Sequence, residues 1–301
     1  MKKAMVQLEG LSRRFPHAKG KGAFSVYEDL NLHINKGEFV CIIGHSGCGK
    51  STVMNTLAGL DKPTDGVVLI DNKEISGPSL EQGVVFQNYS LLPWLTTLGN
   101  VLFGVRARWP GWSKIKQIEH CKYYLNMVGL DSVYDRKPSE LSGGMRQRVS
   151  IARAFATQPK LLLLDEPFGA LDALTRGVIQ DELMKICQQT HQTVFMITHD
   201  VDEAILLSDR VLLMSNGPMA RIAESVTVDI ARPRKRGKVI EDPMYYKIRN
   251  YLVDFLVNRS ADYRVNKDQK DWKFPITANL KQVAGESSPP VTPALRTISS
   301  C

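Results

Sequence analysis

The stretch Gly44-His45-Ser46-Gly47-Cys48-Gly49-Lys50-Ser51-Thr52 decides the fold of this chain. It follows an apolar run at 39–43 and precedes residues 53–58, which have the composition of a helix. Glycines let the backbone turn so tightly that successive N–H groups point at one anion, and the start of the next helix adds partial positive charge. Strand, glycine-rich loop and helix in this order predict a P-loop rather than a merely structural turn.

The residues of this loop suit a nucleoside triphosphate, and all nine are candidate nucleotide-binding residues. Lys50 is expected to reach the β- and γ-phosphates, Ser51 to place its hydroxyl on Mg²⁺, and Thr52 to assist from the first helical turn. Cys48 is the cysteine through which we expect thiol reagents to inhibit the protein.

Composition indicates a globular protein of one large domain or two small ones. The chain has 301 residues, of which 43% are hydrophobic. No run approaches the ~18 to 20 apolar residues of a membrane span, and the start lacks the apolar stretch of a signal peptide, so a cytoplasmic location is expected. The five cysteines form no CxxC pair, which argues against a disulfide framework or a zinc site.

The net charge of +8 is compatible with a nucleic acid, a membrane surface or a nucleotide as partner. Much of the excess lies in Arg232-Pro233-Arg234-Lys235-Arg236-Gly237-Lys238. Because no aromatic residues interleave with these charges, a solvated or membrane-proximal segment is favoured over nucleic-acid binding.

A second motif follows the four leucines at 161–164, which suit a strand buried on both faces of a parallel sheet. Asp165, at the end of this strand, can bind Mg²⁺ as an outer-sphere ligand, through the water molecules that surround the ion. The adjacent Glu166 then points to where a water attacking the γ-phosphate would lie, and is the candidate general base. A purely structural carboxylate is the alternative for Glu166.

Strands and helices alternate along most of the chain, which predicts an α/β fold with a parallel sheet. Helical periodicity between residues 88 and 155, broken at 109–112, indicates a helical insertion into a core formed by 1–87 and 156–225. Near the start, Phe15 and Tyr27 are both candidates to stack on an adenine ring, with core packing as the alternative.

A third motif, Leu141-Ser142-Gly143-Gly144-Met145-Arg146-Gln147-Arg148, opens another helix. Ser142 and the N–H groups of Gly143 and Gly144 form a second anion site. With this motif the chain resembles the ATP-binding cassette (ABC) proteins, whose signature it matches. Gln87 matches the Q-loop of that family, Leu171-Asp172 the D-loop and His199 the switch histidine, so the resemblance covers about residues 4–225.

The resemblance implies a P-loop NTPase core with a parallel sheet, an antiparallel β subdomain and an inserted α-helical subdomain. It implies a head-to-tail dimer in which each ATP lies between the P-loop of one subunit and the signature of the other. Carried over, Gln87 and Asp165 serve Mg²⁺ and the attacking water, Glu166 is the base, and His199 contacts the γ-phosphate. Phe15 becomes the aromatic residue that stacks on adenine.

Gln87 is followed by an apolar, aromatic segment, Asn88-Tyr89-Ser90-Leu91-Leu92-Pro93-Trp94. This segment is suited to bind the coupling helix of a permease, with packing in the core of the helical subdomain as the alternative. Residues 83–94 look like those of the ATPases of nitrate, sulfonate and taurine importers. Residues 226–260 are similar to the C-terminal extension of that group and are expected to add a helix, and 261–301 are expected to be a disordered tail.

The resemblance therefore implies an ATPase subunit at the cytoplasmic face of the plasma membrane, with ATP and Mg²⁺ as its cofactors. The favoured cargo is nitrate or nitrite; bicarbonate, cyanate, sulfonate or taurine are alternatives, as is a soluble ATPase not tied to transport. The expected partners are permease subunits, a second cassette and, indirectly, a solute-binding protein. The second cassette is expected to be a longer paralogue with a solute-sensing domain, with a homodimer as the alternative and no nucleic acid involved.

Overall fold

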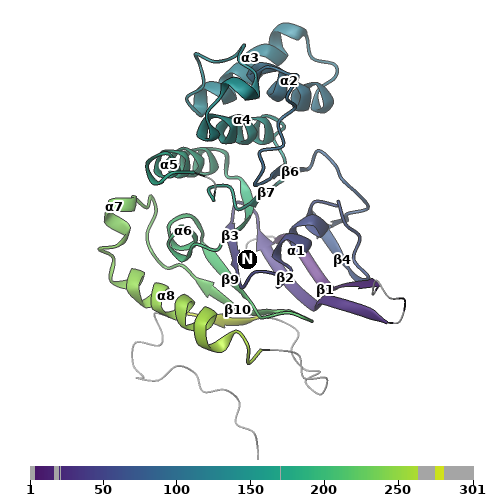
Figure 1. Ribbon diagram of the computed structural model, residues 1–301, viewed down its shortest axis with the longest axis vertical. Coiled ribbons are helices and arrows are strands. Elements are labelled where there is room, and N and C mark those ends of the chain that lie inside the picture. Colours follow the sequence, from purple (N-terminus) through teal and green to yellow (C-terminus); the bar gives the residue numbers. More distant parts are fainter. Residues whose placement is uncertain (1–3, 17–19, 21, 170, 264–274, 281–301) are drawn as a thin grey trace, which may run out of the picture.

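The computed structural model describes residues 4–16, 20, 22–169, 171–263 and 275–280. Two sheets form the body of the molecule, and three helices form a separate lobe (Figure 1). The strands are β1 (Ala4–Pro16), β2 (Ala23–Asn35), β3 (Phe39–Ile43), β4 (Asp65–Ile70), β5 (Lys73–Glu74), β6 (Gln82–Val85), β7 (Leu161–Asp165), β8 (Thr193–Ile197), β9 (Arg210–Met214), β10 (Ile222–Thr227) and β11 (Ile276–Ala278). The helices are α1 (Lys50–Leu57), α2 (Thr97–Arg108), α3 (Lys114–Met127), α4 (Gly143–Ala156), α5 (Ala173–Thr190), α6 (Val201–Leu207), α7 (Arg236–Val239) and α8 (Pro243–Asp254), with helical turns η1 (Pro138–Glu140) and η2 (Phe255–Arg259).

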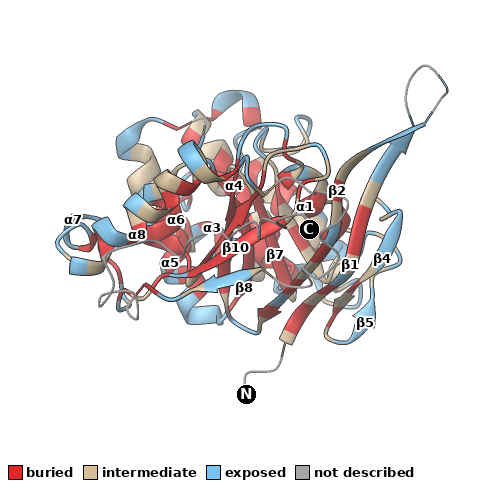
Figure 2. Cartoon of the chain, turned by 90° about the horizontal axis from the view of Figure 1, so that it is seen from below, coloured by how far each residue is buried: buried red, intermediate tan, exposed pale blue. Residues whose placement is uncertain are grey.

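The central sheet has the order β11-β10-β9-β3-β8-β7-β6, and the five strands from β9 to β6 are parallel. The leucines of β7 show that both faces of this strand are covered. Leu162 and Leu164 join the core cluster that includes the helical lobe, whereas Leu161 and Leu163 join the cluster beneath the second sheet. All four are fully buried, so the predicted strand with two covered faces is confirmed. Figure 2 shows this buried centre in red.

The second sheet, β2-β1-β4-β5, is antiparallel and packs beside the first. Tyr27 on β2 is fully buried within it, and its hydroxyl lies 2.9 Å from Oγ1 of Thr56. This burial raises the pKa of Tyr27 to about 12. Tyr27 is therefore a core residue, and the alternative that it stacks on adenine is wrong.

The helical lobe consists of α2, α3 and α4, which contact one another. The predicted break between the first two is confirmed, because α2 ends before Trp109 and α3 begins after Ser113. The rings of Trp109 and Trp112 stack with their centroids 4.4 Å apart, which fixes the connecting turn. None of the helices in the described residues combines the length and the hydrophobicity that a membrane-spanning helix needs.

The C-terminal extension packs on the core through α8, which contacts α6. Residues 261–301 were predicted to form a disordered tail. This prediction is wrong for Ile276–Ala278, which pairs with β10 as an edge strand. Pairing there satisfies backbone groups that β10 would otherwise leave open, an effect of tertiary structure that local composition does not reveal. Residues 281–301 lie outside the described part of the chain.

The basic segment before α7 contains two anchoring arginines. Arg234 is buried and donates hydrogen bonds to the carbonyls of Ile205, Ser208, Val228 and Ile230. Arg232 donates to Asp209 and to the carbonyl of Leu207. Together they satisfy carbonyls at the C-terminal end of α6 that lack partners within the helix. The interpretation of this segment as solvated is therefore wrong for these two arginines.

Candidate functional site

The P-loop joins β3 to α1, and its conformation depends on glycine at two positions. Gly49 has a φ of 104°, and a Cβ added there would lie 2.6 Å from Cγ1 of Val26. A Cβ on Gly44 would lie 3.0 Å from the carbonyl oxygen of Met214. The loop thus packs against β2 and β9 more closely than side chains allow, and leaves His45, Ser46 and Gly47 exposed.

Lys50 lies inside this loop and is almost fully buried. Its Nζ donates to the carbonyl oxygens of Gly44, at 2.8 Å, and His45, at 2.9 Å. These bonds fix the ammonium group beside the backbone of the loop. Because its partners there are backbone carbonyls and not a carboxylate, the positive charge remains available for an anion.

Asp165 and Ser51 lie together beside Lys50. The hydroxyl of Ser51 faces the carboxylate of Asp165 closely enough to lower its pKa. Burial raises the pKa of Asp165, the neighbouring Glu166 raises it further, and Lys50 and Ser51 oppose the rise. A carboxylate and a hydroxyl here, with the amide of Gln87, form the all-oxygen donor set that Mg²⁺ prefers, so the residues fit that ion.

Three predicted residues meet at one carboxylate oxygen. The Nε2 of Gln87 donates to Oε2 of Glu166 at 3.3 Å, and Nδ1 of His199 lies 3.4 Å from the same oxygen. They follow β6, β7 and β8, adjacent parallel strands whose carboxyl ends meet at one edge of the sheet. Glu166 has a φ of 44°, an uncommon backbone conformation for a residue other than glycine and one that occurs at functional sites.

The backbone after His199 is fixed by the start of α6. Asp200 is the N-cap of this helix, and its carboxylate accepts from the N–H groups of Asp202 and Glu203. The hydroxyl of Thr198 donates to the buried carboxylate of Glu203 at 2.8 Å. His199 therefore projects from a short connection whose two neighbouring residues are both held.

The signature residues open α4, as predicted. Ser142 is the N-cap and accepts from the N–H of Met145. A Cβ on Gly144 would lie 2.4 Å from Thr175 on α5, and one on Gly143 would lie 3.3 Å from the hydroxyl of Tyr89. These signature residues belong to the helical lobe, whereas the P-loop belongs to the body of the molecule (Figure 1).

Phe15 lies near the end of β1 and is partly exposed, with the guanidinium of Arg13 4.1 Å from the centre of its ring. Its partner across the strand pair is Phe24, which the sequence did not single out. Phe24 lines a cavity of about 360 Å³ together with P-loop residues His45 to Gly47 and the loop at 216–218. Only the register of the strand pair could have identified Phe24 as a candidate, because opposite residues of an antiparallel pair share one face.

Cys48 is only 1% exposed, and burial raises the pKa of its thiol. The other three cysteines of the described part of the chain are also buried. Thiol reagents attack the exposed thiolate, so the expectation that Cys48 mediates inhibition is wrong for this conformation.

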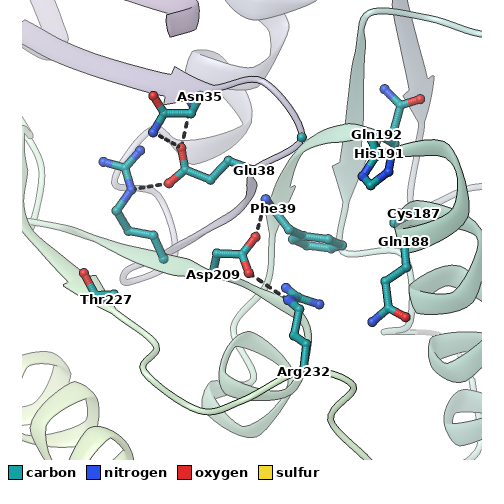
Figure 3. A pocket seen from close by; sticks show the side chains of 12 residues that line it. Asn35, Glu38, Phe39, Cys187, Gln188, His191, Gln192, Asp209, Thr227 and Arg232 are labelled. Atoms are coloured by element: carbon teal, nitrogen blue, oxygen red, sulfur yellow. Dashed lines mark hydrogen bonds and ion pairs between the residues drawn. The ribbon is translucent and has the colours of Figure 1, made fainter. Parts of the chain in front are cut away.

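A larger cavity, of about 500 Å³, lies at the opposite edge of the sheet, where β3, β8 and β9 begin (Figure 3). Its lining includes two ion pairs, Glu38 with Arg210 and Asp209 with Arg232. Asp209 also accepts from the backbone N–H of Phe39. None of the predicted site residues lines this cavity, and its Asp209–Arg232 pair attaches the C-terminal segment to the start of β9.

The fold and the converging side chains define an ATPase of the ABC class, and comparison with known proteins agrees. The family model described as "ABC transporter" matches residues 27–169. A dimeric structure of the bacterial ABC transporter cassette MJ0796 superposes with a TM-score of 0.68 at 33% identity, covering 75% of this chain and all of that one.

The chain belongs to the ABC transporter family, in the group of nitrate and bicarbonate transport ATPases. It is 51% identical to the bicarbonate transport ATP-binding protein CmpD of Synechocystis sp., over 86% of this chain and 91% of that protein. Identity is also 51% to CmpC of the same organism, but the match spans 83% of this chain and 38% of CmpC. The nitrate transport protein NasD of Klebsiella oxytoca is 48% identical over 85% of this chain and 98% of its own length.

Proposed function

We propose that this chain hydrolyses ATP to drive import of a small oxyanion through a membrane-embedded permease. The observation that carries the proposal is the meeting of Gln87 and His199 at one carboxylate oxygen of Glu166, at the edge of the sheet that also presents the P-loop. A general base, a polar group to orient water and a phosphate-binding loop are the parts that hydrolysis of a γ-phosphate requires.

In this proposal the N–H groups of residues 44–52 and the ammonium of Lys50 bind the phosphates. Glu166 accepts the proton of the attacking water, Gln87 orients that water, and His199 contacts the γ-phosphate. Ser51, Gln87 and Asp165 would hold Mg²⁺, which would supply positive charge to neutralise the phosphates.

The base of the nucleotide is assigned to the aromatic pair on β1 and β2. Phe15 offers a ring face, as the sequence predicts, and Phe24 extends that surface towards the cavity beside the P-loop. Stacking on aromatic rings suits adenine because both partners are flat and polarisable.

We further propose that Ser142, Gly143 and Gly144 serve the ATP of a second cassette in a head-to-tail dimer. The separation of this anion site from the P-loop in one chain supports the arrangement. The partner that we propose is a longer paralogue, because the chain matches nearly all of CmpD but little more than a third of CmpC. A homodimer is the second candidate.

The helical lobe carries the surface that we assign to the permease. Trp94 is 69% exposed and Phe103 on α2 is 60% exposed, and the first lies seven residues after Gln87. Exposed aromatic side chains close to one another in sequence are typical anchors of protein interfaces. We accordingly propose that the chain acts at the cytoplasmic face of the plasma membrane, with a solute-binding protein as an indirect partner and no nucleic acid.

For the cargo, nitrate or nitrite is our first candidate and bicarbonate our second. Relatives named for bicarbonate transport reach 51% identity and those named for nitrate transport 48%, so the comparisons support both. Nitrate and bicarbonate are planar monovalent oxyanions of similar size. Cyanate, sulfonate and taurine rank below them because the relatives reported above are named for bicarbonate or nitrate transport.

The experiment that tests the proposal is co-purification of the tagged chain from gently solubilised membranes of its native host. A permease and a larger cassette, together with ATP hydrolysis by the complex, are the expected result. Recovery of ribosomal or DNA-repair proteins without a permease would contradict transport and point to the soluble alternative.

A further inference from the structure

The α8 segment, defined as residues 243–260, contacts the P-loop and the start of α6, the helix that follows His199. Three of its side chains, Ile248, Leu252 and Phe255, are fully buried against the core. Burial of these three apolar side chains attaches the segment firmly to the core. Both of its ends reach beyond this anchor to polar groups near the nucleotide site.

One end of the α8 segment holds the P-loop. The Nε2 of His45 lies 2.6 Å from the carbonyl oxygen of Leu256 and 3.1 Å from the hydroxyl of Ser260. Ser260 is 2% exposed, and its carbonyl accepts from the N–H of Asn216, in the loop that shares a cavity with His45. His45 is thus joined to the α8 segment through its ring and to Lys50 through its carbonyl.

The other end of the α8 segment holds the start of α6. The hydroxyl of Tyr245 donates to Oδ1 of Asp202 at 2.8 Å, and Nε of Arg249 lies 2.9 Å from the same oxygen. Asp202 is three residues after His199, and its own N–H is capped by Asp200. A shift of Asp202 would therefore move the connection from which His199 projects.

We propose that the α8 segment positions the P-loop and the connection that carries His199. His45 is the positioning residue for the P-loop, and the Tyr245–Asp202 bond positions His199. The inference rests on the proposed ATPase function. His45, Ser46 and Gly47 are exposed, so few other contacts restrain the tip of the P-loop. Fixing that tip before ATP arrives reduces the ordering that binding must achieve, while fixing α6 affects only the step that uses His199.

Substitutions at the two ends of the α8 segment are therefore expected to have different kinetic effects. Loss of one hydrogen bond corresponds to about a five-fold change in an equilibrium or rate constant. His45→Ala is expected to raise the Kd of a fluorescent ATP analogue about five-fold, and His45→Gln to restore it, because its amide can donate to Leu256. Ser260→Ala is expected to raise Kd about two-fold without changing kcat. Tyr245→Phe is expected to lower kcat about five-fold without changing Kd.

Tyr251→Phe is the matched control. It makes the same chemical change on the same helix, but the hydroxyl it removes donates to Glu224 on β10 and touches neither loop. It is expected to lower the melting temperature and leave Kd and kcat unchanged. The inference is overturned if Tyr245→Phe and Tyr251→Phe have the same effect on kcat, or if His45→Ala binds the analogue as tightly as the wild type. Failure of the wild-type complex to bind the analogue would instead count against the proposed function.

Discussion

The Nδ1 of His199 lies 3.4 Å from Oε2 of Glu166, although the two residues are 33 positions apart in sequence. Neighbouring parallel strands β7 and β8 bring them together, and Gln87, after the next strand, approaches the same oxygen. The side chains proposed for base, γ-phosphate contact and water orientation thus share one position beside the P-loop.

Replacing Glu166 with Gln should abolish turnover without preventing nucleotide binding. The amide keeps the size of the carboxylate but cannot accept the proton of water, and loss of a general base costs roughly 10²-fold or more. Single-turnover hydrolysis by the purified complex measures the effect, with Glu74→Gln on exposed β5 as the matched control. Near-normal hydrolysis with both cassettes altered would contradict the role of Glu166.

Lys50→Ala should weaken ATP binding itself. A hydrogen bond to a charged group contributes about 1.5 to 3 kcal/mol, which corresponds to roughly a 10- to 150-fold rise in Kd. Titration with a fluorescent ATP analogue measures it, and a melting curve checks that the internal bonds to Gly44 and His45 are not the cause. Lys73→Ala, on β5, serves as the control. An unchanged Kd for Lys50→Ala would exclude the P-loop assignment.

Arg234→Met should destabilise the protein by about 2 to 4 kcal/mol. Methionine fills much of the same space but leaves four carbonyls, including two at the end of α6, without their donor. Urea unfolding measures the change. The neighbouring Lys235 is exposed, and Lys235→Met should stay within about 0.5 kcal/mol of the wild type. Equal stability of the two variants would show that Arg234 is not an anchor.

Trp94→Ala should weaken assembly with the permease and leave nucleotide binding by the isolated chain intact. Truncating an interface anchor costs about 2 kcal/mol or more, roughly a 30-fold loss of affinity. Quantitative co-purification with the permease measures it. Ile115→Ala, at an equally exposed apolar residue of α3, is the control. If Trp94→Ala recovers as much permease as the wild type does, Trp94 is not part of the surface that binds the permease.

Modification of Cys48 by a maleimide should be slow in the native protein. Its thiol is buried and its pKa is raised, so between pH 7 and 8 less reactive thiolate is present than for a free cysteine. Peptide mapping by mass spectrometry should show at least about ten-fold slower labelling than in urea. Equal rates would show that the P-loop opens freely.

Much of the fold and most of the candidate site were predictable from sequence because they depend on local order along the chain. Four leucines before Asp165 define a buried strand, and the resemblance to ABC proteins assigned Glu166 and His199 to the same γ-phosphate. Arg234 and Phe24 were missed for the opposite reason. The role of Arg234 depends on carbonyls of α6 that are almost thirty residues away in sequence. The role of Phe24 depends on the register of β1 and β2, and local sequence composition reveals neither relationship.

The most direct test of the account is uptake of labelled nitrate by host cells that lack this chain, complemented with the wild type or with Glu166→Gln. We predict that the deletion abolishes uptake, that the wild type restores it, and that Glu166→Gln does not. Labelled bicarbonate, measured in the same cells, identifies the cargo if nitrate uptake is unaffected and bicarbonate uptake is lost instead. Unchanged uptake of both ions in the deletion strain would contradict the proposed oxyanion importer.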